Sequence, residues 1–208
     1  MKKIEAKKIF NGNADFILGA HNFSQIPNHH YPEIAFIGAS NTGKSSLINS
    51  LIGKKIAIVS STPGRTRQIN FFKISGYKDG FVIVDMPGYG FAKAKEKHIA
   101  HWQKTSFLYL TKRTNLKRVF LLIDIIKGIQ ENDQEAINIF NSLGVSFQIV
   151  FTKIDKLNIE KQKNIIEKNY EKIKNSPALY PQLIATSSSK KYGIEELQNT
   201  IVEILQNL

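Results

Sequence analysis

The sequence predicts an α/β fold: a mostly parallel sheet of six strands with one antiparallel strand and helices on both faces. Short apolar segments of strand length alternate with segments of helical periodicity along most of the chain. Such alternation is typical of parallel sheets, because each crossover between parallel strands places a helix on a face of the sheet. The predicted strands cover residues 33–38, 68–74, 81–85, 118–124, 147–151 and 183–186.

The first predicted strand, EIAFIG, is followed at once by a glycine-containing loop and a helix over residues 44–51. The next two strands are joined by the hairpin-like segment SGYKDG at residues 75–80, which makes one of them antiparallel. Each of the last three strands precedes a helix, at about residues 131–143, 158–175 and 194–206. The last helix is amphipathic, since apolar residues recur there at helical spacing: Ile194, Leu197, Ile201, Ile204 and Leu205.

The length of 208 residues favours one domain. Residues 33–208 are predicted to form it. Residues 1–32 contain two prolines and two glycines, and they predict a partly irregular N-terminal extension that packs on this domain.

The composition excludes several classes of site. The chain has no cysteine, which removes disulfides, iron–sulfur clusters, thiol nucleophiles and cysteine-ligated zinc. The longest uninterrupted apolar run, at residues 119–123, is far shorter than the roughly 20 residues of a membrane span. We therefore expect a cytoplasmic protein with no membrane partner.

The net charge of +12 is concentrated at residues 93–118, which hold eight basic residues and one acidic residue. A dense basic segment suits a polyphosphate partner such as a nucleic acid, because each neutralised phosphate releases counterions. The same concentration of basic residues would also arise if the segment were a solvent-exposed, lysine-rich helix face with no nucleic-acid partner. Three aromatic residues of this segment, Trp102, Phe107 and Tyr109, are predicted to belong to the core rather than to stack on bases.

The strongest chemical signal is GASNTGKS at residues 38–45, which fits the P-loop pattern G-x4-G-K-[ST] between a strand and a helix. Its glycines let backbone N–H groups wrap phosphates, and the helix N-terminus adds the positive end of its dipole. Lys44 would reach the β- and γ-phosphates, and the Ser45 hydroxyl would bind Mg²⁺. The residues expected around the nucleotide are Gly38, Ala39, Ser40, Asn41, Thr42, Gly43, Lys44, Ser45 and Ser46.

A second motif, DMPG, comes at the end of the strand FVIVD. By itself this pattern is a turn. Behind a P-loop it predicts that Asp85 holds Mg²⁺ through water and that the Gly88 N–H touches the γ-phosphate, with Met86 and Pro87 beside the nucleotide.

Two further segments predict recognition of guanine. Thr152, Lys153, Ile154 and Asp155 follow the strand QIVF. The Asp155 carboxylate can accept from guanine N1–H and the exocyclic amine, and the Lys153 stem can lie on the base plane. The final strand is followed by four hydroxyl residues whose N–H groups could donate to guanine O6, although serine clusters often mark simple loops: Thr186, Ser187, Ser188 and Ser189.

The remaining loop would close over Mg²⁺. Two of its threonines, Thr62 and Thr66, carry a suitable hydroxyl, and Thr66 is the predicted ligand because it lies nearer the following strand. Gly64 and Arg65 would line the nucleotide beside it. The alternative is a simple turn at the preceding proline and Gly64.

These five motifs, in their order along the chain, resemble the translation-factor-type GTPases, and in detail the EngB family of ribosome-biogenesis GTPases. The detailed resemblance is carried by PEIAFIGASNTGKSSLINSL, TPGRTRQINFF, VDMPGYGFAK and VFTKIDKL, together with Trp102, Tyr109, Leu110, Arg113, Asp133 and Gln134. It implies a single Ras-like P-loop GTPase domain that hydrolyses GTP to GDP with Mg²⁺, with Lys44, Thr66 and Gly88 as the residues acting at the phosphates.

The resemblance also implies a partner. Members of the family assemble the large ribosomal subunit, so the expected role is GTP-gated binding, as a monomer, to precursor particles of rRNA and ribosomal proteins. Normal growth and cell division, including septation, would depend on it. This chain departs from the family pattern at Ala39, Thr42 and Arg65, and at Ile126 and Lys127, where an Arg-His pair is usual.

Two residues bear on the rate of hydrolysis. Tyr89 follows Gly88 where many GTPases place a water-orienting glutamine, so we expect slow intrinsic turnover. In related GTPases an asparagine at the position of Asn41 helps bind K⁺, which makes potassium dependence an expectation here.

Two other functions are alternatives to a GTPase that assembles ribosomes. The chain could be a P-loop kinase, or a nucleotide-gated RNA-binding module in which hydrolysis is incidental.

Overall fold

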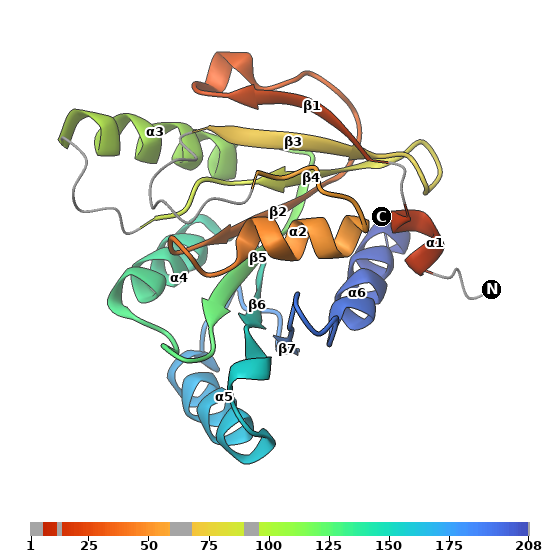
Figure 1. The fold of residues 1–208 in the computed structure, drawn as a ribbon. Helices are drawn as coiled ribbons and strands as arrows, with labels where there is room; N and C mark the ends of the chain where they lie inside the picture. The colour runs from red at the N-terminus through yellow and green to blue at the C-terminus, as the bar shows by residue number, and fades with distance from the viewer. Residues whose placement is uncertain (1–5, 12–13, 59–67, 90–95, 208) are drawn as a thin grey trace.

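The structure, a computed structural model, describes residues 6–11, 14–58, 68–89 and 96–207. In the helix at residues 96–112, side chains are described from Lys104 onward. Figure 1 shows one twisted sheet with helices packed against it.

The sheet has seven strands in the order β1-β3-β4-β2-β5-β6-β7. Strand β3 is antiparallel to both of its neighbours, and the other pairs are parallel, which confirms the single antiparallel strand of the predicted hairpin. The predicted count of six strands is wrong by one. The strands are β1 (Ala14–Ala20), β2 (Glu33–Gly38), β3 (Ile69–Ile74), β4 (Phe81–Asp85), β5 (Leu116–Asp124), β6 (Phe147–Thr152) and β7 (Ile184–Ala185).

The additional strand, β1, lies within the segment expected to be a partly irregular extension. It pairs with β3 at the edge of the sheet, and its register shifts between Phe16 and Leu18. The shift breaks the alternation of buried and exposed residues that marks a strand in a sequence, because one residue is added on that side of the ladder. Phe16 is half exposed and packs its ring against Phe72 of β3.

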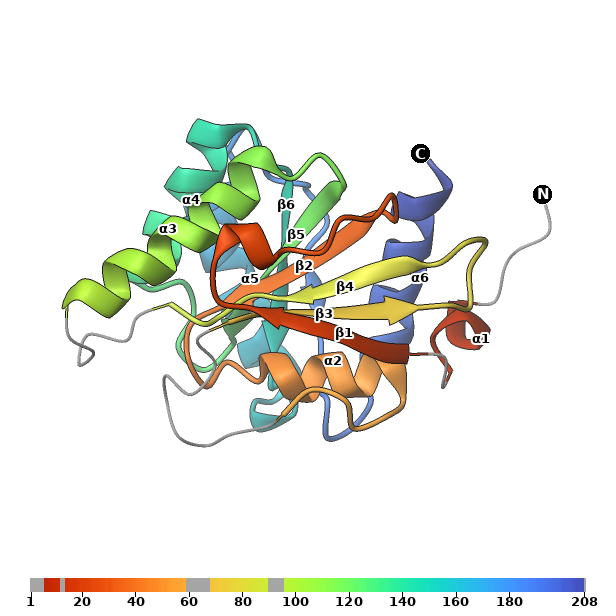
Figure 2. The same cartoon turned by 90° about the horizontal axis from the view of Figure 1, so that it is seen from above.

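The helices form two layers, one on each face of the sheet, as predicted. One layer contains α1 (Ala6–Phe10), α2 (Lys44–Ile52) and α6 (Ile194–Gln206). The other contains α3 (Glu96–Lys112), α4 (Glu131–Leu143) and α5 (Ile159–Ile173), and Figure 2 shows α3 beside α4 on this side. Alternate residues of β2 belong to different layers, which explains why the central strands are apolar throughout.

Helix α3 has one face in the core and one face outside. Tyr109 is fully buried, as predicted, but Phe107 is 48% exposed, so its assignment to the core is wrong. Lys104 and Lys112 are exposed as well. The side chain of Trp102 lies outside the described residues. No helix in the described part of the chain is long and apolar enough to cross a membrane.

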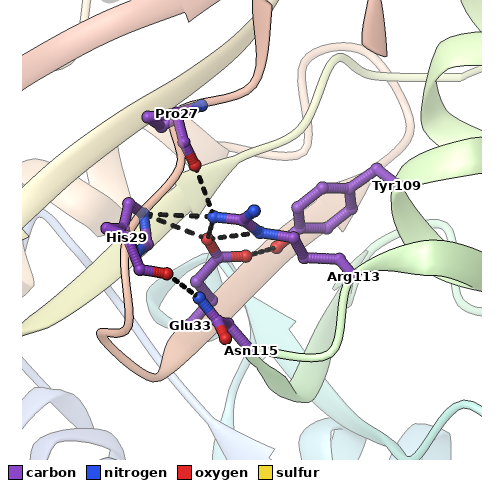
Figure 3. Close-up of polar contacts among 6 residues, drawn as sticks. All are labelled: Pro27, His29, Glu33, Tyr109, Arg113 and Asn115. Atoms are coloured by element: carbon purple, nitrogen blue, oxygen red, sulfur yellow. Dashed lines mark hydrogen bonds and ion pairs between the residues drawn. The ribbon is translucent and has the colours of Figure 1, made fainter. Parts of the chain in front are cut away.

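The end of α3 is fixed by a polar cluster at the amino-terminal edge of β2 (Figure 3). The fully buried Glu33 carboxylate accepts from Arg113 Nε at 2.9 Å, from Arg113 Nη2 at 2.6 Å and from the Tyr109 hydroxyl at 2.8 Å. Arg113 Nη2 also donates to the Pro27 carbonyl at 2.8 Å. Burial, reinforced by Glu33, raises the pKa of Tyr109 far above its usual range, so the phenol stays a neutral donor.

Candidate nucleotide site

The P-loop lies at the carboxyl end of β2, at the edge of the sheet where ligands of open α/β folds bind. Gly43 has a φ of +92°, which a residue with a side chain rarely adopts, and it is the N-cap of α2. The cap contributes no side-chain acceptor to the first turn. Backbone N–H groups at the start of α2 are therefore disposed to receive an anion.

The loop is stiffened from within. The backbone N–H of Thr42 donates to the Ala39 carbonyl at 3.3 Å, and the Thr42 hydroxyl donates to the same oxygen at 2.9 Å. Asn41, at the tip, has a φ of +66°, a conformation that asparagine tolerates better than most residues. The P-loop thus has a defined shape before any ligand is considered.

Lys44 and Asp85 form a buried ion pair. The Lys44 ammonium donates to the Asp85 carboxylate, and the two side chains are 9% and 3% exposed. The pair joins the residue predicted for the phosphates to the one predicted for Mg²⁺. Each charge compensates the other. A buried carboxylate needs such a partner, because an unpaired charge away from water is costly.

The segment after Asp85 lies directly against the P-loop. The Tyr89 N–H donates to the Gly38 carbonyl and the Ser40 N–H to the Tyr89 carbonyl, both at 3.3 Å. A Cβ on Gly88 would stand 3.1 Å from the Gly38 oxygen and 3.3 Å from the Ser40 nitrogen. A side chain at this position would therefore crowd the P-loop and force it to shift by a few tenths of an ångström.

The end of β6 is fastened to the P-loop from the other side. Lys153 Nζ donates to the Asn41 carbonyl and to Asp124 Oδ2, both at 2.7 Å. The Thr152 hydroxyl donates to the Thr42 carbonyl at 2.6 Å. From the sequence, no role is predicted for Asp124. The signal that could have revealed it is its position at the end of a predicted strand, which it shares with Asp85.

The two segments predicted to recognise guanine meet. The Ser187 hydroxyl donates to Asp155 Oδ1 at 2.6 Å and lies 3.1 Å from the Ser189 hydroxyl. The Ile154 N–H donates to the Thr186 carbonyl at 3.2 Å. The bond from Ser187 is the main reason why the pKa of Asp155 lies below its usual range. The carboxylate is therefore an acceptor at neutral pH, as a pair of donors on a base requires.

The structure thus brings together the P-loop, the DMPG segment and both segments predicted to recognise guanine. Gly64, Arg65 and Thr66, with the alternative Thr62, lie outside the described residues, so the predicted closing loop is not described. The hydrogen bond between the Tyr89 hydroxyl and Asp133 is not predicted by the sequence, because the two residues are far apart in the chain.

Comparison with known families agrees with this arrangement. Residues 33–153 match the family described as 50S ribosome-binding GTPase, and residues 108–207 match the GTP-binding domain of elongation factor Tu. A probable GTP-binding protein EngB from Sinorhizobium fredii is 44% identical over 202 residues, which is 94% of this chain and 93% of that protein. Its counterpart from Allorhizobium ampelinum is 45% identical over 195 residues, covering 90% and 89%.

Solved structures show the same fold. A crystal structure of a probable EngB is 24% identical with a TM-score of 0.60, and it covers 85% of this chain and 99% of that chain. Era from Aquifex aeolicus, bound to GDP and aluminium fluoride, is 23% identical with a TM-score of 0.70, covering 85% and 57%. With this fold, this P-loop and close relatives along nearly its whole length, the chain belongs to the EngB family of GTP-binding proteins and is a P-loop GTPase.

Proposed function

We propose that this GTPase is a nucleotide-gated assembly factor for the large ribosomal subunit. It binds precursor particles of rRNA and ribosomal protein in its GTP state, acts in the cytoplasm as a monomer, and is needed for growth and cell division, including septation. The observation that carries the proposal is a pair of exposed lysines on α3, Lys104 and Lys112, on a helix that follows in the chain the segment lying on the P-loop.

The described side chains reduce the basic segment to a smaller surface. Arg113 is bound to buried Glu33, and Arg118 lies over the Tyr180 ring and donates to Gln148 at 3.2 Å. Lys104 and Lys112 remain exposed on α3, with Phe107 between them. These three residues form the proposed RNA-facing surface, since cations bind phosphates and an exposed ring can stack on an unpaired base.

At the nucleotide, the P-loop residues Gly38–Ser46 would surround the phosphates, with Lys44 at the β- and γ-phosphates. The Gly88 N–H would meet the γ-phosphate, and Met86 and Pro87 would lie beside it. Asp155 would select guanine, Lys153 would cover the base, and the N–H groups of residues 186–189 would donate to O6. Thr66, with Gly64 and Arg65, would close the site.

The donor set fits Mg²⁺. The Ser45 hydroxyl would bind Mg²⁺ directly, the Asp85 carboxylate would hold it through water, and Thr66 would add a further oxygen, in keeping with the preference of Mg²⁺ for hard oxygen ligands. Bound Mg²⁺ would neutralise charge on the β- and γ-phosphates. When GTP binds, the Lys44 ammonium would turn from Asp85 to the phosphates and free the carboxylate for the metal, so no charge in the buried site would be left uncompensated.

The proposal is tested by co-sedimentation with ribosomal particles, using protein loaded with GDP or a non-hydrolysable GTP analogue. We expect the analogue to increase binding to large-subunit particles at least about tenfold, a coupling of typical size for a two-state protein. Equal binding in both states would contradict gating. Absence of binding in both would leave a GTPase with another partner.

Reversing charge on α3 should weaken this binding. For Lys104→Glu combined with Lys112→Glu, we expect the plot of log affinity against log salt to become less steep. The magnitude of its slope should decrease by about 1 to 2, because up to two phosphate contacts are lost. The control, Lys168→Glu with Lys172→Glu on exposed α5, makes the same charge change elsewhere. Equal losses in both pairs would show that only net charge matters.

Hydrolysis should depend on potassium. The Asn41 side chain is exposed at the tip of the P-loop, and no described residue makes a hydrogen bond to it. If K⁺ binds there, it adds positive charge beside the phosphates during hydrolysis. We therefore expect turnover at least about tenfold faster in KCl than in NaCl. Asn41→Gly, which keeps the positive φ, should remove the difference. Equal rates for the unaltered protein would discard the K⁺ site.

A further inference from the structure

The side chain of Tyr89 reaches from the DMPG segment to helix α4. Its hydroxyl donates to Asp133 Oδ1 at 2.5 Å. Asp133 is buried in the first turn of α4, and its other oxygen, Oδ2, accepts from the Gln130 N–H at 2.8 Å. The acceptor is therefore held in place by the cap of its own helix.

Tyr89 is thus held at two points. Its main chain pairs with Gly38 and Ser40 of the P-loop, and its ring is held by α4. Burial and then Asp133 raise the pKa of Tyr89 well above its usual range, so the phenol remains protonated and donates at physiological pH. A hydrogen bond between a neutral donor and a charged acceptor is among the stronger kinds in proteins.

We propose that Asp133 is a positioning residue for the GTP state, acting through Tyr89. The bond fixes the residue after Gly88, and so holds Gly88 against the P-loop, where its N–H can meet a γ-phosphate. A nucleotide without that phosphate gains nothing from this placement. The bond therefore favours GTP over GDP. This inference rests on the γ-phosphate contact proposed for Gly88.

The test is Tyr89→Phe, which removes one hydroxyl and keeps the ring. The measurement is the dissociation constant for GDP and for a non-hydrolysable GTP analogue, both with Mg²⁺. We expect the analogue to bind about tenfold more weakly, the size of one lost bond to a charged group, while GDP affinity stays within about twofold. The matched control is Tyr170→Phe on α5, which should leave both affinities unchanged.

A second variant separates positioning from folding. Asp133→Asn weakens the bond but also disturbs the cap of α4, so it can lower stability. In the Tyr89→Phe background, Asp133→Asn should cause no further change in the ratio of the two affinities, because the contact it acts through is already gone. A second loss as large as the first would overturn the inference.

Gly88→Ala separates this inference from the role on which it rests. The added Cβ crowds the P-loop, so we expect a selective loss of analogue affinity. If Gly88→Ala changes the ratio and Tyr89→Phe does not, the role of Asp133 is refuted and that of Gly88 stands. If neither changes it, the γ-phosphate contact fails, and the inference fails with it.

Discussion

Asp155→Asn should lower GTP affinity at least about 100-fold, because the carboxylate that we propose accepts two donors of guanine is replaced by an amide. One of those donors, the exocyclic amine, would then face the amide N–H₂. Xanthine carries a carbonyl in place of that amine, so we expect the variant to bind xanthosine triphosphate better than GTP. Competition against a fluorescent guanine nucleotide measures both affinities.

The pH dependence gives a second check on Asp155. Its pKa is lowered, chiefly by the bond from Ser187, so the carboxylate loses its charge only as pH falls through a value below the ordinary one of about 3.9. The preference of the unaltered protein for GTP over ATP should therefore be constant from pH 8 to about pH 5, because the terminal phosphate titrates alike in both nucleotides. A fall in this preference between these limits would show that another group governs recognition.

Glu33→Gln should cost about 3–5 kcal/mol of unfolding free energy, because Arg113 would lose the carboxylate that compensates it in a largely buried site. For a chain of this length, that loss lowers the melting temperature by about 10 °C. The nucleotide site lies at the other end of β2, so GTP affinity at low temperature should be nearly unchanged.

A matched control is Glu203→Gln on α6, where the glutamate is exposed. Thermal unfolding followed by circular dichroism should show a shift of no more than about 2 °C for that variant. Comparable melting temperatures for Glu33→Gln and the unaltered protein would mean that the cluster of Figure 3 contributes little to stability.

The sequence was informative where chemistry is local. The P-loop needs glycine, lysine and serine at fixed spacing, and the strand before it is buried on both faces, so both were predicted at their observed positions. The predicted helices after residue 130 agree with the structure to within a few residues for the same reason, since periodicity and caps are read from neighbouring residues.

The sequence was less informative where a residue's role depends on distant contacts. Arg113 belongs to a basic segment, and only the fold places it on a buried glutamate 80 residues away in the chain. Phe107 is apolar but faces outward on α3. From the sequence, Tyr89 indicates only that a water-orienting glutamine is absent, because nothing nearby in the sequence points to its acceptor on α4.

Strand β1 has a consequence for how copies of the chain meet one another. Without it, β3 would end the sheet and present the row INFFKI with unpaired N–H and C=O groups, a template on which another chain could add a strand. β1 satisfies that row and offers in its place an edge that is interrupted by a register shift and carries an exposed aspartate, Asp15, beside the half-exposed Phe16. The register shift and the charge make this edge a poorer template for an added strand than the uninterrupted row of β3 would be.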